Sequence, residues 1–131
     1  MNKRGADRLF KLMHNWRNLL GMGGWMLDLQ IYERTDLPPE VHAGHIGLLK
    51  AEGRQASAII HVAEFAANGT PAGTVIHELV HLVLTDMRIT LLQATAELGT
   101  AGQAINQRYD DAEERAVNRI TTALIKLDER E

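Results

Sequence analysis

Residues 70–86 read TPAGTVIHELVHLVLTD, and this stretch determines how the rest of the chain is interpreted. Thr70 suits the N-cap of a helix, and Pro71 suits its first position, where the missing N–H of proline costs nothing. The apolar residues that follow would cover most of a helix circumference, which is typical of a central helix. The pattern therefore predicts a helix over residues 71–86.

Two histidines stand four positions apart in this stretch, His77 and His81, and Glu78 follows the first of them. Residues i and i+4 of a helix lie one above the other, with Cβ atoms about 5–6 Å apart. Both imidazoles can then reach one zinc ion at about 2.0–2.1 Å. Glu78, turned by about 100° on the helix, would lie beside the ion and accept a proton from a water that the ion activates. This spacing predicts zinc-dependent hydrolysis with Glu78 as general base.

The composition restricts the other possibilities. The chain has 131 residues, no cysteine, and 14 Lys+Arg against 17 Asp+Glu. Without cysteine, a metal must be held by histidines and carboxylates. Without a basic excess, nucleic acid is not an expected partner. No apolar run approaches the roughly 20 residues that span a membrane, and no signal peptide is recognised, so we expect a cytoplasmic protein.

Periodicity in the flanking segments predicts the remaining elements. An apolar stripe over residues 4–20 indicates an N-terminal helix that glycines end, and the stripe over residues 110–127 indicates a C-terminal helix. Three strands are expected at residues 25–31, 44–52 and 56–63, the last two forming a hairpin. The segment 87–108 is less patterned; residues 89–98 suggest a short helix and Gly99–Gly102 a loop that can act as a lid.

Three segments together resemble a known family: AIIHV at residues 58–62, TVIHELVHL at residues 74–82, and Glu113-Glu114 in the C-terminal helix. Over residues 25–127 the chain is similar to small single-domain zincin metallopeptidases, namely minigluzincins, ImmA/IrrE-like peptidase domains and phage-type zincins. The resemblance implies an α+β, zincin-like single domain over residues 1–131. Its parts would be the N-terminal helix, a small, mostly antiparallel three-stranded sheet, the active-site helix 71–86 and the C-terminal ligand helix 110–127.

The resemblance also implies a substrate site and a gluzincin-like set of zinc ligands. A peptide or protein substrate would bind as an added strand along a sheet edge, expected at residues 56–63. His77 and His81 would bind zinc together with a glutamate of the C-terminal helix, and water would take the fourth position. Tyr109, just before that helix, is a candidate donor to the oxyanion.

Two glutamates compete for the third ligand position. On a helical wheel Glu113 shares the apolar face with Val117, which favours it as the inward carboxylate. The family pattern instead favours Glu114, because an apolar residue and Asn118 follow it three and four positions later. We predict Glu114 as the ligand, with Glu113 as the alternative.

Two other functions stay open. The chain can be a zincin-fold regulatory or assembly protein with one narrow protein target or latent activity. It can also be a non-enzymatic helical binding protein that carries the motif by chance.

Overall fold

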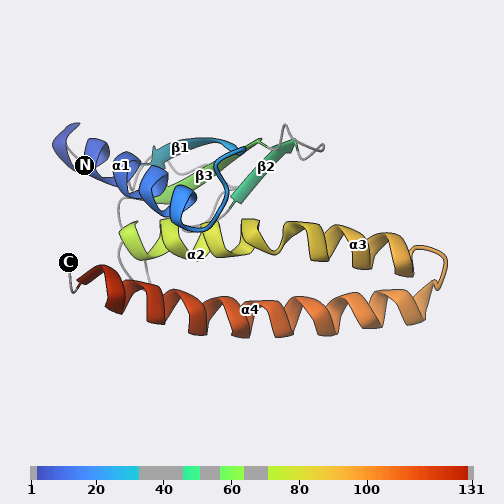
Figure 1. Cartoon of the computed structure of the whole chain (residues 1–131). Helices are drawn as coiled ribbons and strands as arrows, with labels where there is room; N and C mark the ends of the chain where they lie inside the picture. The colour runs from blue at the N-terminus through green and yellow to red at the C-terminus, as the bar shows by residue number, and fades with distance from the viewer. Residues whose placement is uncertain (1–2, 33–45, 51–56, 64–70, 130–131) are drawn as a thin grey trace. The chain divides into compact units, whose positions relative to one another are not determined.

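The structure is a computed structural model of the chain, and it describes residues 3–32, 46–50, 57–63 and 71–129. These ranges hold four helices and three strands, which carry their labels in Figure 1. The chain divides into two compact units, residues 1–79 and 80–131, and the boundary falls inside one helix. The expected single domain over residues 1–131 stays a prediction.

The first helix, α1, spans Lys3–Leu19 and buries Leu9, Met13 and Trp16, which follow each other at helical spacing. Gly21 ends it with a φ of 75°, a left-handed conformation that glycine adopts without strain. The Met22 N–H donates to the Arg17 carbonyl at 2.9 Å, and the Gly21 N–H donates to the Asn18 carbonyl at 3.1 Å. This pair of bonds is the Schellman motif, which satisfies carbonyls at the helix end.

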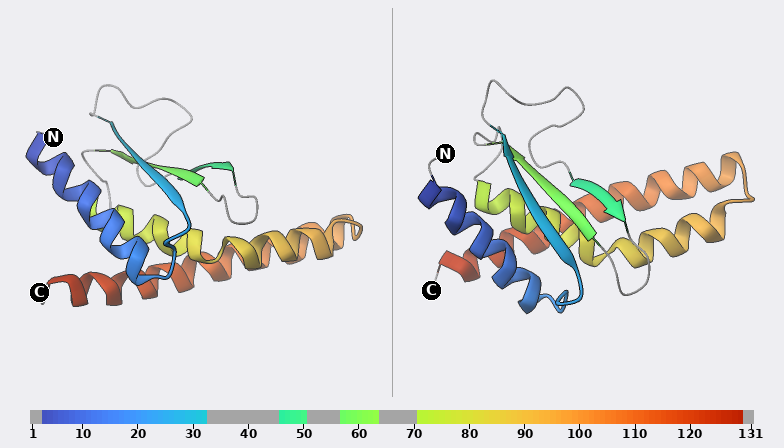
Figure 2. Two further views of the ribbon diagram at one scale, coloured as in Figure 1. Left: turned by 45° about the horizontal axis from the view of Figure 1, so that its top comes forward. Right: turned by 90° about the horizontal axis from the view of Figure 1, so that it is seen from above.

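Three strands follow: β1 (Met26–Tyr32), β2 (Ile46–Lys50) and β3 (Ser57–Ala63). They form one sheet in the order β1-β3-β2, and the right-hand view of Figure 2 shows β3 between its two neighbours. β1 and β3 run parallel, from Met26 opposite Ser57 to Tyr32 opposite Ala63. β2 runs antiparallel to β3, with an irregular register between Gly47 and Lys50. On β1 the side chain of Leu27 is buried, whereas its neighbour Met26 is exposed.

The expected zincin-like α+β fold with a mostly antiparallel sheet is wrong. The longest strand pair is parallel, because β3 returns along β1 after the β2 segment. Helices, rather than strands, make up most of the described residues. The strand at residues 56–63 is also not the free edge expected for a substrate, because β3 is hydrogen-bonded on both sides. Among the described strands, β1 and β2 are the outer strands of this sheet.

The helix with the histidines, α2, spans Pro71–Val83 and ends three residues before the expected boundary at 86. The Leu84 N–H donates to the His81 carbonyl at 3.1 Å, which tightens the last turn. The Thr85 hydroxyl donates to the same carbonyl at 3.5 Å, a side-chain bond that competes with continued helix. A further helix, α3, then starts at Thr85 and runs to Thr95.

The last helix, α4, spans Thr100–Glu129 and begins ten residues before the expected ligand helix 110–127. α3 and α4 run side by side in opposite directions (Figure 1). The two helices lie close together at Gly102, where a Cβ atom would overlap the Thr95 carbonyl oxygen. The expected loop or lid at Gly99–Gly102 is therefore wrong. Gly99, with a φ of 57°, belongs to the turn, while Gly102 lies in the helix and permits the close approach.

No helix in the described part of the chain is both long and apolar enough to cross a membrane.

Candidate metal centre

Helix α2 places His77 and His81 one turn apart on the same face, as their spacing predicts. Both side chains are half-buried. The neighbouring apolar residues Ile76, Leu79 and Val80 are buried and anchor the helix. Glu78 lies between the two histidines in the chain and is only 6% exposed. The motif thus sits on a firmly packed helix, with two imidazoles that keep partial access to solvent.

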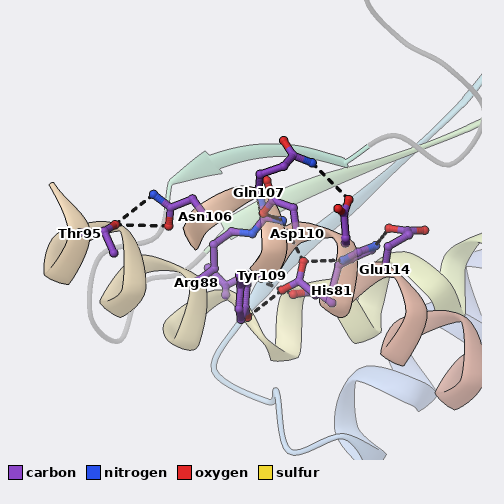
Figure 3. Close-up of polar contacts among 11 residues, drawn as sticks. His81, Arg88, Thr95, Asn106, Gln107, Tyr109, Asp110 and Glu114 are labelled. Atoms are coloured by element: carbon purple, nitrogen blue, oxygen red, sulfur yellow. Dashed lines mark hydrogen bonds and ion pairs between the residues drawn. The ribbon is translucent and has the colours of Figure 1, made fainter. Parts of the chain in front are cut away.

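Glu113 and Glu114 follow each other on α4 but lie in opposite environments. The side chain of Glu113 is 3% exposed and that of Glu114 is 53% exposed. Both contact the ring of His81: Nδ1 lies 3.1 Å from Oε2 of Glu113, and Nε2 lies 3.0 Å from Oε2 of Glu114. The imidazole therefore lies between two carboxylates, one buried and one exposed. Figure 3 shows the His81 ring beside Glu114.

A group of three side chains has the composition of a zinc site. One ligand atom from each of His77, His81 and Glu114 lies within 4.8 Å of the other two. Two imidazoles and one carboxylate form the ligand set of catalytic zinc sites, which leave one position for water. The exposed side chain of Glu114 gives this group access to solvent. The donor set therefore fits a catalytic zinc ion.

The buried carboxylate of Glu113 has further partners. The Arg88 guanidinium, from α3, donates from Nη2 to Oε2 of Glu113 at 2.9 Å. The Tyr109 hydroxyl donates to the other oxygen, Oε1, at 3.0 Å. Arg88 also pairs with Oδ1 of Asp110 at 2.9 Å. A buried carboxylate is tolerated when it is paired and hydrogen-bonded in this way.

The Tyr109 phenol keeps its proton to a higher pH than an ordinary tyrosine, because its pKa is raised. Burial raises its pKa, and so do the hydrogen bond to Glu113 and the negative charges of Glu113 and Asp110; the charge of Arg88 opposes them. Tyr109 lies within α4, not before it. Because its hydroxyl donates to Glu113, Tyr109 stabilises that carboxylate in this structure and is not placed as a donor to an oxyanion.

Of the other histidines, His14 is the one whose side chain the structure describes. His14 belongs to α1, where its ring contacts Phe10 with centroids 4.7 Å apart. His61 belongs to β3, and its side chain lies outside the described residues, as do His42 and His45.

Arg88 was not anticipated from the sequence. It lies seven residues after His81, which is about two helical turns and would indicate the same face if the helix were continuous. The segment 87–108 lacks a clear apolar stripe, so its pattern did not indicate that Arg88 would face the C-terminal helix.

Comparisons with protein-family models, with curated proteins and with solved structures found no match for this chain.

Proposed function

We propose that the protein is a zinc-dependent peptidase in which Glu78 is the general base. The observation that carries the proposal is the grouping of His77, His81 and Glu114. The same helix supplies a carboxylate directly after the first histidine. This combination is the arrangement used for metal-assisted hydrolysis.

In this proposal His77 and His81 hold the ion through ring nitrogens, and Glu114 holds it through a carboxylate oxygen. A bound zinc ion supplies Lewis acidity, which lowers the pKa of a water towards about 7 and polarises a carbonyl. Glu78 takes the proton from the attacking water and passes it to the departing amine. Zinc is preferred over iron because the two histidines come from a helical His-Glu-x-x-His motif.

The site residues differ in how firmly they are held. Glu78 is anchored in a buried position on α2, and this limits its rotamers. Glu114 is exposed and can adjust to an incoming ion. The substrate is proposed to be an extended peptide or protein segment that adds to a sheet edge, which here means β1 or β2. A cytoplasmic location stays a prediction from the sequence.

The test is hydrolysis of an unfolded protein such as reduced casein by the zinc-loaded chain. Glu78→Gln removes the base while keeping a side chain of the same size. We expect it to retain one zinc per chain and to lose activity by about 10²–10⁴-fold. Glu97→Gln, at an exposed glutamate in the turn between α3 and α4, is the matched control and should keep full activity.

Two outcomes would contradict the proposal. Wild-type protein that binds no zinc excludes the metal centre. Zinc-loaded protein whose hydrolysis is equal in the wild type and in Glu78→Gln excludes the proposed base.

A further inference from the structure

We propose that Glu113 is a positioning residue for the metal centre, which holds His81 so that its Nε2 atom faces the ion. This inference rests on the proposed zinc site. It separates the roles of two adjacent glutamates: Glu114 binds the ion, and Glu113 orients one of its ligands.

Each nitrogen of the His81 ring contacts a different glutamate. Glu113 contacts Nδ1 and Glu114 contacts Nε2, so the two carboxylates address opposite nitrogens. A carboxylate has no proton to donate, so the 3.1 Å contact with Glu113 fits a hydrogen on Nδ1. The 3.0 Å contact of Nε2 with Glu114 would also take a hydrogen when no ion is bound, and a bound ion would replace that hydrogen between Nε2 and Glu114. In a neutral imidazole with Nδ1 protonated, the free electron pair is on Nε2. Glu113 thus selects the nitrogen that lies beside the exposed Glu114.

The contacts of Glu113 carry the second step, because they hold its carboxylate in place. Arg88 donates to Oε2 and Tyr109 donates to Oε1, so both oxygens are used. With 3% of its side chain exposed, Glu113 would have to give up these bonds to move to a ligand position. Glu114 has more than half of its side chain exposed, so it can reach an ion without leaving a buried position.

The third step concerns the effect on the ion. An outer carboxylate that accepts a hydrogen bond from a ligating histidine fixes the ring orientation and makes the ligand more basic. Losing such a partner typically lowers metal affinity by about 10–100-fold without changing the ligand set. Oε2 of Glu113 is shared by His81 and Arg88. The charge of Arg88 therefore moderates that of Glu113 at the ring.

The experiment compares zinc affinity, measured by competition with a chromophoric chelator, among wild type, Glu113→Gln, Glu114→Gln and Arg88→Gln. Cobalt replaces zinc in a parallel set, because its absorption reports the number of ligands. Nitrogen NMR of the histidine rings, recorded without metal at a pH where the imidazoles are neutral, reports the tautomer of His81. Thermal unfolding without metal shows whether each variant is folded.

We expect Glu113→Gln to bind zinc about 10–100-fold more weakly, with an unchanged cobalt spectrum and a weakened preference for the Nδ1-protonated tautomer. Glu114→Gln should change the cobalt spectrum, because it removes a ligand. Arg88→Gln removes a 2.9 Å contact of Glu113 but keeps the contact between Glu113 and His81, so it should weaken zinc binding by less than Glu113→Gln does. If Glu113→Gln does not fold, Glu113→Asp retains the charge but shortens the reach to His81, and the same loss of affinity is expected.

Three results would overturn the inference while the proposed function stands: unchanged zinc affinity in Glu113→Gln, a changed cobalt spectrum in that variant, or an equal loss of affinity in Arg88→Gln. Absence of zinc binding in the wild type would instead overturn the proposed function. In that case the tautomer measurement still decides whether Glu113 orients His81.

Discussion

The Nδ1 atom of His81 lies 3.1 Å from Oε2 of Glu113, a residue 32 positions later in the chain. This contact links the end of α2 to the middle of α4. The same ring contacts Glu114 through its other nitrogen, at 3.0 Å. The two successive glutamates thus contact opposite nitrogens of one imidazole, because their side chains leave α4 at different angles.

Zinc should stabilise the folded chain, because the ligands converge only when α2 and α4 are folded. At a free zinc concentration 100 times the dissociation constant, the free energy of unfolding should rise by about 2.7 kcal/mol. Glu114→Gln should abolish most of this gain. Asp111→Asn, which changes an exposed carboxylate on the same helix, should keep it. Thermal unfolding with and without zinc and a chelator measures the effect, and an equal response in both variants would contradict Glu114 as a ligand.

Tyr109 should make the fold sensitive to alkali. Its pKa in the folded protein is raised above the ordinary value of 10.0, chiefly by burial. The unfolded chain therefore loses this proton first, so the contribution of Tyr109 to the free energy of unfolding should be constant well below pH 10 and should fall as the pH rises through the raised pKa. Urea unfolding across this range measures the slope.

Tyr109→Phe is the matching variant, and it should flatten that pH dependence. The chain contains two tyrosines, so subtracting the tyrosinate absorbance of the variant from that of the wild type should isolate the transition of Tyr109, which is expected above its ordinary pKa of 10.0. The variant should also be less stable by about 1–3 kcal/mol at neutral pH, because buried Glu113 loses a donor. A wild-type titration with both tyrosines at their ordinary pKa would contradict this prediction.

Gly102→Ala should destabilise the pair formed by α3 and α4. Inside a helix this substitution normally stabilises by about 0.8–1.0 kcal/mol. Here the added Cβ would overlap the Thr95 carbonyl oxygen, and relieving the overlap should cost about 1–3 kcal/mol. Gly23→Ala is the control, since nothing lies within 4 Å of its Cβ position. Urea unfolding should show a loss for Gly102→Ala only, and a gain there would contradict the close approach.

Met13 should be a main contributor to the core near α1. Its side chain is completely buried, so Met13→Ala should lower the free energy of unfolding by about 2–5 kcal/mol. Met26→Ala provides the control, because Met26 is 71% exposed. Similar losses for the two variants would contradict the assigned burial.

Local signals in the sequence predicted the features that depend on local spacing. The helical phase of His77 and His81 follows from their separation, and the end of α1 follows from Gly21. The pairing of the strands did not follow, because period-two alternation does not state which strand lies between the other two. The parallel pairing of β1 with β3 depends on long-range packing and has no local mark.

Two features of the last helix, α4, also depend on contacts that local patterns do not indicate. Gly102 suggested a loop, because a glycine usually weakens a helix, whereas here it permits close contact with α3. The separate roles of Glu113 and Glu114 could not be read from the helical wheel alone. The wheel correctly indicated that Glu113 points inward, yet inward burial favours contacts with Arg88 and Tyr109 as much as it favours a metal.

The short turn between α3 and α4 fixes the rotation of α4 about its own axis. α4 advances by about 100° per residue, so one residue inserted between Gly99 and Gly102 would bring Glu113 to the angle that Glu114 now has. The buried partner of His81 would then be displaced from Arg88. An insertion more than ten residues from either glutamate would thus remove the buried partner of His81, because Ala112 would take the place of Glu113. An insertion after Thr121 would leave both glutamates where they are.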